Sequence, residues 1–153
     1  MNEKFCCVTG HRDIPANKTE YVKAKLKEEI KQAIADGFTL FITGMAEGTD
    51  LLFAELVLEQ KAKHPELFLR AAIPYRNRLN TTDPLFIKCF EGCDSVEIQQ
   101  DNYSSSCFMN RNRYMVSLSS RVIAVYDGRN KGGTLFTMRY ARMQEREVRE
   151  IRI

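Results

Sequence analysis

Short apolar runs alternate with longer segments of helical periodicity along the whole chain. Runs of apolar and β-branched residues predict strands at 4–10, 38–44, 67–74, 94–99, 121–128 and 146–153. Amphipathic or largely apolar patterns predict helices at 18–36, 49–63, 84–91, 107–119 and 132–144. This regular alternation favours a parallel sheet that helices cover on both faces, which is an α/β fold.

Capping residues mark the ends of two of these helices. Asn17 and Glu20 have the spacing of a capping box at the start of the first helix, and Gly37 is placed to end it. Asp83, which a proline follows, predicts the N-cap of the third helix. No linker, repeat or low-complexity tract interrupts the 153 residues, so a single domain over 1–153 is expected.

The composition, 44% hydrophobic and 28% charged, is that of an ordinary soluble globular protein. The apolar runs are too short to span a bilayer, and the N-terminus shows no signal peptide. We therefore expect no membrane association and a cytoplasmic location. The net charge is only +3, but ten Lys or Arg and four Asp or Glu lie from Arg111 onward. This asymmetry indicates either an anionic partner or the solvated faces of the terminal elements.

The five cysteines have no spacing that suggests a disulfide framework. Cys89 and Cys93 are four residues apart and could share one face of a helix, as a zinc or redox pair would. A second pair of ligands is missing, so small apolar packing residues are the favoured interpretation. We predict no metal site and no cofactor.

Three glycine-containing loops follow predicted strands: "TGHRDIP" at 9–15, "TGMAEGTD" at 43–50 and "DGRNKGGT" at 127–134. The carboxyl ends of parallel strands meet at one edge of the sheet, where ligands bind. Helix N-termini offer unpaired N–H groups to phosphate, and glycine lets the backbone approach closely. The alternative is that each glycine only satisfies a turn. The chain contains neither G-x-x-x-x-G-K-[ST] nor G-x-G-x-x-G.

Side chains near these loops extend the candidate site. His11 could act as an acid or base, bond a ligand or cap its own turn, and Asp50 could bond ribose hydroxyls or cap the following helix. Aromatic residues at strand and helix ends could stack on a base or cover the core: Tyr75, Phe108, Tyr114 and Tyr126. The candidate ligand-binding residues are Gly10, His11, Arg12, Gly44, Gly48, Asp50, Arg111, Gly132, Gly133 and Thr134.

Several of these motifs resemble those of a known superfamily. "TGMAEGTDLLFAELVL" resembles the S-G-x-A-x-G-x-D segment of the DprA/Smf DNA-processing proteins. "RNRYMVSLSSRVIAV…GGT" is similar to the R-K-x-x-M…P-G-G-x-G-T segment of the LOG hydrolases, which activate cytokinins. The two groups define the SLOG superfamily. "CCVTGHRDIP" and "GGT-x-x-T-x-x-Y-A" look most like its YpsA-like branch, and the resemblance runs from residue 5 to about 142.

The resemblance implies a three-layer Rossmann-like fold with strand order 3-2-1-4-5 plus a terminal strand, and a site for a nucleotide-derived ligand. The residues matching its phosphate cradle would be Gly44, Gly48, Gly132, Gly133 and Thr134, and Arg111 would match the arginine of R-K-x-x-M. The catalytic glutamate of the LOG hydrolases is replaced by Thr137. A threonine cannot stabilise an oxocarbenium ion or activate water as a carboxylate does, so cleavage by the LOG mechanism is not expected.

Three functions are consistent with this sequence. The first is a sensor or binding module for a nucleotide or nucleotide-derived phosphorylated ligand. The second is an N-glycosidic-bond hydrolase or transferase that uses a different carboxylate, Glu47 or Asp50. The third is DprA-like binding of single-stranded DNA, suggested by the basic C-terminal part. The resemblance also makes a homodimer possible, because related proteins commonly form dimers.

Overall fold

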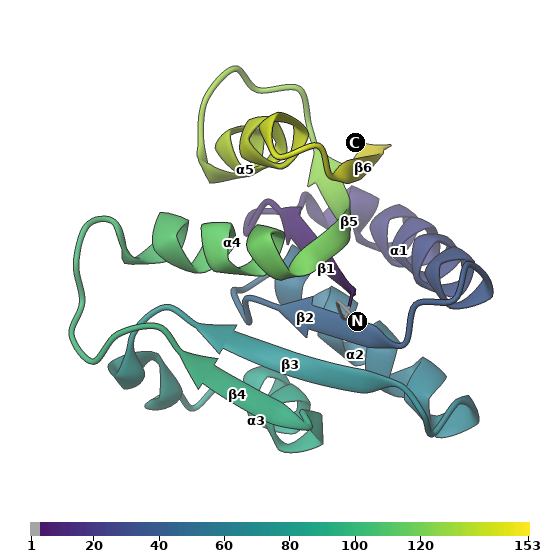
Figure 1. The fold of residues 1–153 in the computed structure, drawn as a ribbon, viewed down its shortest axis with the longest axis horizontal. Helices are drawn as coiled ribbons and strands as arrows, with labels where there is room; N and C mark the ends of the chain where they lie inside the picture. Colours follow the sequence, from purple (N-terminus) through teal and green to yellow (C-terminus); the bar gives the residue numbers. More distant parts are fainter. Residues whose placement is uncertain (1–3) are drawn as a thin grey trace.

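The computed structural model describes residues 4–153, and its centre is one six-stranded sheet in which all strands are parallel. The strand order is β4-β3-β2-β1-β5-β6 (Figure 1). The strands are β1 (Phe5–Gly10), β2 (Leu40–Thr43), β3 (Phe68–Ile73), β4 (Ser95–Ile98), β5 (Ser119–Tyr126) and β6 (Glu147–Arg152).

Helices cover both faces of the sheet and make three layers. One face carries α1 (Thr19–Ala35), α2 (Thr49–Lys63) and α3 (Pro84–Gly92), and the other carries α4 (Cys107–Leu118) and α5 (Gly133–Met143) (Figure 1). Two short 3₁₀ turns, Ala16–Lys18 and Arg76–Leu79, follow the ends of β1 and β3. The predicted α/β, Rossmann-like fold is therefore confirmed.

The buried side chains of β1 alternate between the two apolar layers, because neighbouring residues of a strand point to opposite faces. Cys6 and Val8 pack in the layer beneath α1, α2 and α3, while Phe5 and Cys7 pack in the layer beneath α4 and α5. Central parallel strands are buried on both faces, which explains why the sequence of β1 is an unbroken apolar run.

The position of β4 is where the strand order departs from the expected one. If β4 is left out and the other five strands are renumbered along the chain, their order in the sheet is 3-2-1-4-5. The strand β4 lies at the edge of the sheet, next to β3. The chain then crosses from β4 through α4 to β5, which pairs with the other side of β1. The direction of the strand order therefore reverses between β1 and β5.

The helix ends agree with the predicted caps in two of three cases. Asp83 accepts a hydrogen bond from the backbone N–H of Leu85 at 3.0 Å, and Gly37 follows the end of α1 with a φ of +97°. The predicted capping box at Asn17 is wrong, because that residue lies in a 3₁₀ turn and α1 begins at Thr19 without a side-chain cap.

Candidate functional site

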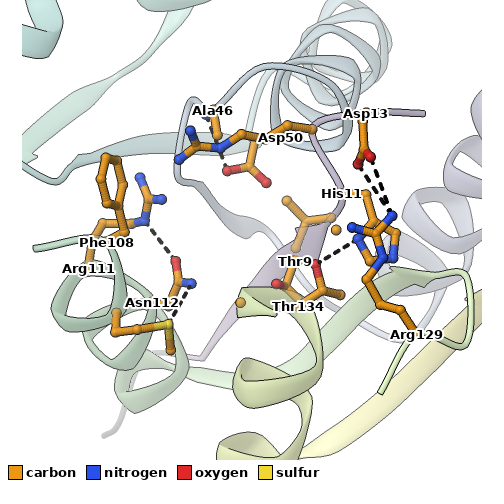
Figure 2. Close-up of a pocket in the computed structure, with 15 residues that line it drawn as sticks. Thr9, His11, Asp13, Ala46, Asp50, Phe108, Arg111, Asn112, Arg129 and Thr134 are labelled. Carbon is orange, nitrogen blue, oxygen red and sulfur yellow. Dashed lines mark hydrogen bonds and ion pairs between the residues drawn. The ribbon is translucent and has the colours of Figure 1, made fainter. Parts of the chain in front are cut away.

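A cavity of about 390 Å³ opens at the carboxyl ends of β1 and β5, where the strand order reverses (Figure 2). Ligands of open α/β sheets bind at this position. Its walls come from the β1–α1 loop, the start of α2, the first half of α4 and the start of α5. The candidate residues lining it are Gly10, His11, Arg12, Asp50, Arg111, Gly133 and Thr134. Gly44, Gly48 and Gly132 do not line it.

Thr49 fastens the β1–α1 loop to the start of α2. Its backbone N–H, at 3.2 Å, and its hydroxyl, at 2.9 Å, both donate to the carbonyl oxygen of His11. A Cβ on Gly10 would lie 2.4 Å from the Thr49 hydroxyl oxygen. Gly48 has a φ of +76°, and a Cβ there would lie 2.6 Å from the carbonyl oxygen of Arg12. These two glycines therefore allow the loops to cross in contact.

A buried carboxylate and a buried guanidinium lie beside each other in the cavity wall. Asp50 is 7% exposed and Arg111 is 4% exposed. The backbone N–H of Ala46 donates to Oδ2 of Asp50 at 3.3 Å, and Nη1 of Arg111 donates to the carbonyl oxygen of Gly44 at 2.6 Å. A Cβ on Gly44 would lie 2.7 Å from Asp50 and 2.8 Å from Arg111, so this glycine makes room for both side chains.

Burial shifts the pKa of both groups towards their neutral forms. Burial raises the pKa of Asp50, and the positive charge of Arg111 acts against that rise. Burial likewise lowers the pKa of Arg111, and the charge of Asp50 acts against that fall. Oδ1 of Asp50 and Nη2 of Arg111 have no hydrogen-bond partner within residues 4–153. Both atoms remain accessible to solvent. Within residues 4–153, only Nη1 of Arg121 is a side-chain polar atom that is fully buried and has no hydrogen-bond partner.

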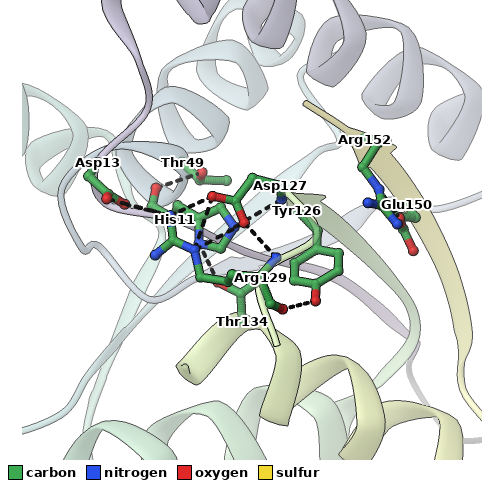
Figure 3. A network of polar contacts seen from close by, with 9 residues as sticks. All are labelled: His11, Asp13, Thr49, Tyr126, Asp127, Arg129, Thr134, Glu150 and Arg152. Carbon is green, nitrogen blue, oxygen red and sulfur yellow. Dashed lines mark hydrogen bonds and ion pairs between the residues drawn. The ribbon is translucent and has the colours of Figure 1, made fainter. Parts of the chain in front are cut away.

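His11 connects the β1–α1 loop to the β5–α5 loop and the start of α5 (Figure 3). Its Nε2 accepts a hydrogen bond from the backbone N–H of Asp127 at 3.1 Å, and its Nδ1 lies 3.4 Å from the hydroxyl oxygen of Thr134. With Nε2 accepting, a neutral ring carries its proton on Nδ1 and directs it at Thr134. Burial lowers the pKa of His11, and the nearby Asp127 carboxylate, 3.2 Å from Nε2, opposes this only in part.

The β5–α5 loop is held by an ion cluster at the rim of the cavity. The Arg129 guanidinium donates to the Asp127 carboxylate at 2.6 and 3.0 Å and approaches Asp13 at 3.4 Å. This hydrogen bonding holds the pKa of Asp127 well below its usual range. The Tyr126 hydroxyl donates to the carbonyl oxygen of Arg129. Two carboxylates therefore balance the charge of Arg129, while Arg12 has no carboxylate within salt-bridge distance among residues 4–153.

The start of α5 is the open end of the site. Gly132 has a φ of +105°, which favours glycine, and a Cβ on Gly133 would meet nothing within 4 Å. No carbonyl or side chain of residues 4–153 accepts from the backbone N–H groups of Gly133, Thr134 and Leu135. Gly133 and Thr134 line the cavity, so the positive end of the helix dipole faces it.

Sequence reasoning missed Thr9, Asp13, Asn112 and Arg129, which also line the cavity. Asn112 accepts from Nε of Arg111 at 2.8 Å and donates to the Thr137 hydroxyl at 3.0 Å. Thr137 in turn donates to the carbonyl oxygen of Gly133 at 2.8 Å. The position of the LOG glutamate is thus occupied by Thr137, whose hydroxyl both accepts and donates a hydrogen bond inside the protein. The one sequence feature that pointed to Asn112 was its position next to the candidate residue Arg111.

The remaining candidates lie elsewhere. Tyr114 accepts a hydrogen bond from Arg70 at 3.2 Å, beneath α4 and away from the cavity. Within residues 4–153 no three His, Cys, Asp or Glu side chains gather closely enough to hold a metal ion. Cys93 donates to the carbonyl oxygen of Cys89 at 3.3 Å. No helix of that range is both long and apolar enough to cross a bilayer.

This geometry defines a Rossmann-like domain in which the N-terminus of α5 faces the cavity, and comparison with known families gives its relationship. The model of the YspA SLOG family, named YpsA, matches residues 6–153. The chain therefore belongs to the YpsA family of the SLOG superfamily, as its loop motifs indicated.

Three known proteins are similar to this chain at low identity. The UPF0398 protein of Ligilactobacillus salivarius is 26% identical over 143 residues, covering 84% of this chain and 78% of the relative. The UPF0398 protein of Bacillus pumilus is 25% identical, covering 90% and 81%. The SPbeta prophage-derived protein YoqJ of Bacillus subtilis is 30% identical over 141 residues, covering 77% and 81%.

Two solved structures have a similar fold. DNA processing protein A from Helicobacter pylori, which binds single-stranded DNA, matches 97% of this chain with a TM-score of 0.66 and 17% identity. The match covers 65% of that protein, so this chain spans less than two thirds of its length. The structural-genomics target TM1055 matches 95% of this chain and 72% of its own, with a TM-score of 0.57 and 17% identity.

The contrast between Gly10 and Gly133 gives a first prediction. Gly10→Ala should lower the free energy of unfolding by about 1–3 kcal/mol, since its Cβ would collide with Thr49. Gly133→Ala should leave it unchanged or raise it slightly, by up to about 1 kcal/mol, because its Cβ enters open space. Urea unfolding measures both values. Equal stability of the two variants would contradict the tight crossing at Gly10.

The burial of His11 gives a second prediction, on pH. Because its folded-state pKa is depressed, the neutral ring stabilises the fold fully above the unfolded-state pKa of about 6.5. That stabilisation should be lost as the pH falls from about 6.5 through the lower folded-state value. NMR titration of His11 measures this pKa, and urea unfolding of His11→Gln should lose this part of the pH dependence. A midpoint above 6.5 would show that the attraction of Asp127 outweighs burial.

Proposed function

We propose that the protein binds a nucleotide or nucleotide-derived phosphorylated ligand in this cavity, as a sensor or binding module. The observation that carries the proposal is the open start of α5. Its three unpaired N–H groups and the helix dipole suit a phosphate, and the absence of side chains at Gly132 and Gly133 leaves room for one. The hydroxyl of Thr134 is a further donor at the same position.

The charged groups of the cavity support a ligand with both anionic and hydroxyl parts. Arg12 and Arg111 supply positive charge, and Nη2 of Arg111 has no hydrogen-bond partner among residues 4–153. Oδ1 of Asp50 has no hydrogen-bond partner within residues 4–153 and is a suitable partner for ribose hydroxyls. Asp50 lies in the same cavity as Arg111 and Thr134 (Figure 2). An inorganic anion alone would leave this carboxylate without a function and would be repelled by it.

Replacing one main-chain donor tests the phosphate position. Gly133→Pro removes the N–H of Gly133 but keeps the helix, because proline is favoured at the first helical position. It should weaken nucleotide binding at least about tenfold, the effect of losing one hydrogen bond to a charged group. Calorimetric titration with nucleoside 5′-mono- and diphosphates measures the affinity.

Gly133→Ala is the matched control, since it adds a Cβ and retains the N–H group. Mass spectrometry of small molecules released from the native protein identifies a ligand that copurifies. Equal affinities of the proline and alanine variants would remove the start of α5 from the site. No binding of any phosphorylated compound by the unsubstituted protein would overturn the proposed function.

The second candidate is hydrolysis of the N-glycosidic bond, and the position of Asp50 favours it. Water would add to the ribose carbon, the bond to the base would break, and the base would leave with a proton. Asp50 is the buried carboxylate of the cavity wall, and a carboxylate there can stabilise positive charge on the ribose or activate the water. Glu47 is exposed and outside the cavity, so it is not a candidate for this role.

Incubation with nucleoside monophosphates and chromatography of the free base tests the second candidate. If the protein is a hydrolase, Asp50→Asn should lower the rate of base release by a factor of about 100 or more. Glu47→Gln is the control and should retain the full rate. Base release that survives Asp50→Asn would exclude Asp50 as the catalytic carboxylate, and intact nucleotide in every sample would support binding without turnover.

A further inference from the structure

Three aromatic rings meet on the side of the cavity formed by α4, and phosphate binding does not account for them. Tyr75 follows β3, Tyr103 lies in the loop before α4, and Phe108 lies in the first turn of α4. Their ring centroids are 5.5 to 6.3 Å apart, in edge-to-face arrangements. Phe108 lines the cavity, and Tyr103 is 62% exposed. We call these three residues the aromatic cluster.

The aromatic cluster is not part of the apolar core. None of its rings belongs to the buried clusters that fill the two faces of the sheet. The helices already cover both faces of the sheet. The contact of the exposed Tyr103 with two further rings is therefore not needed to cover the core. The arrangement therefore indicates a surface for a ligand, not a cover for the core.

Arg12 adds a planar cation to the aromatic cluster. Its guanidinium carbon lies 4.9 Å from the centroid of the Phe108 ring, a cation–π contact, and both residues line the cavity. Within residues 4–153 no carboxylate fixes this guanidinium. Aromatic rings and arginine planes are the surfaces on which proteins stack nucleobases.

We propose that the aromatic cluster and Arg12 form a base-stacking subsite, so that the ligand is a nucleotide with an intact base and not a sugar phosphate. This rests on the proposed function, because the phosphate position orients the ligand. Phe108 and Thr134 lie on opposite sides of the same cavity, with Asp50 between them (Figure 2). A nucleotide has the matching order of parts: its phosphate meets Thr134, its ribose meets Asp50 and its base meets Phe108.

The surroundings favour one nucleotide over a nucleic-acid strand. Asp13 lies at the cavity rim, and Asp101, two residues before Tyr103, pairs with Arg76 at 2.9 Å. Carboxylates beside a bound strand would repel its phosphates, whereas strand binders present a groove of unopposed positive charge. A volume of about 390 Å³ is also near the lower end of small-molecule pockets, about 300–1,000 Å³.

Paired ligands with and without a base test this subsite. The full chain is titrated calorimetrically with the four ribonucleoside 5′-monophosphates and with ribose 5-phosphate, which has the same phosphate and sugar but no base. Tyr103→Ala and Phe108→Leu should weaken binding of the preferred nucleotide about tenfold or more and leave ribose 5-phosphate unchanged. Tyr21→Ala is the control, since Tyr21 is an exposed tyrosine on α1 outside the cavity.

The outcomes separate the subsite from the phosphate position. Loss of nucleotide affinity to the level of ribose 5-phosphate supports the subsite. Equal binding of nucleotide and ribose 5-phosphate by the unsubstituted protein, or unchanged nucleotide affinity in both variants, overturns the subsite but leaves the phosphate position intact. No binding of either ligand overturns both proposals. Binding of oligothymidine that depends on Tyr103, with unaffected mononucleotide binding, overturns the subsite in favour of a single-strand surface.

Discussion

The candidate site depends on the two hydrogen bonds that Thr49 donates to the carbonyl oxygen of His11. They join the β1–α1 loop directly to the start of α2. His11 then reaches the β5–α5 loop through Asp127 and the start of α5 through Thr134. Thr49 and His11 together thus connect three loops that lie far apart in the sequence, and the cavity keeps its shape because these loops are fixed relative to one another.

The glycines of the site serve two different physical purposes. At Gly10, Gly44 and Gly48 the missing side chain makes room for other protein groups, including Asp50 and Arg111. At Gly133 a Cβ would meet nothing within 4 Å among residues 4–153, and at Gly132 it would meet only Cδ of Arg129, at 3.9 Å, so the missing side chains leave open space there. A glycine that lets protein groups pack closely and a glycine that leaves open space look the same in the sequence. Only the second kind leaves room for a ligand.

Periodicity and turn residues were sufficient to predict the layers, because each strand and helix is determined by nearby residues. The placement of β4 at the edge and the absence of a cap at Asn17 were not predictable in this way. The first depends on pairing between distant strands, and the second on a competing turn. The glycine loops predicted the sheet edge at which the cavity opens. The hydrogen bonds from Arg111 to Gly44 and Ala72 appear only after folding, because these residues are far apart in the sequence. The contact of Tyr75 with Phe108 is of the same kind.

The two sides of the cavity are built from different kinds of atoms. At the start of α5 the donors belong to the main chain, and their directions follow from the helix itself. At the aromatic cluster the contact surface consists entirely of side chains. Substitution during evolution can exchange a tyrosine or a phenylalanine, but it cannot delete a peptide N–H without introducing proline. A single substitution can therefore remove part of the flat surface, whereas the donors at the helix end persist through every substitution other than one to proline.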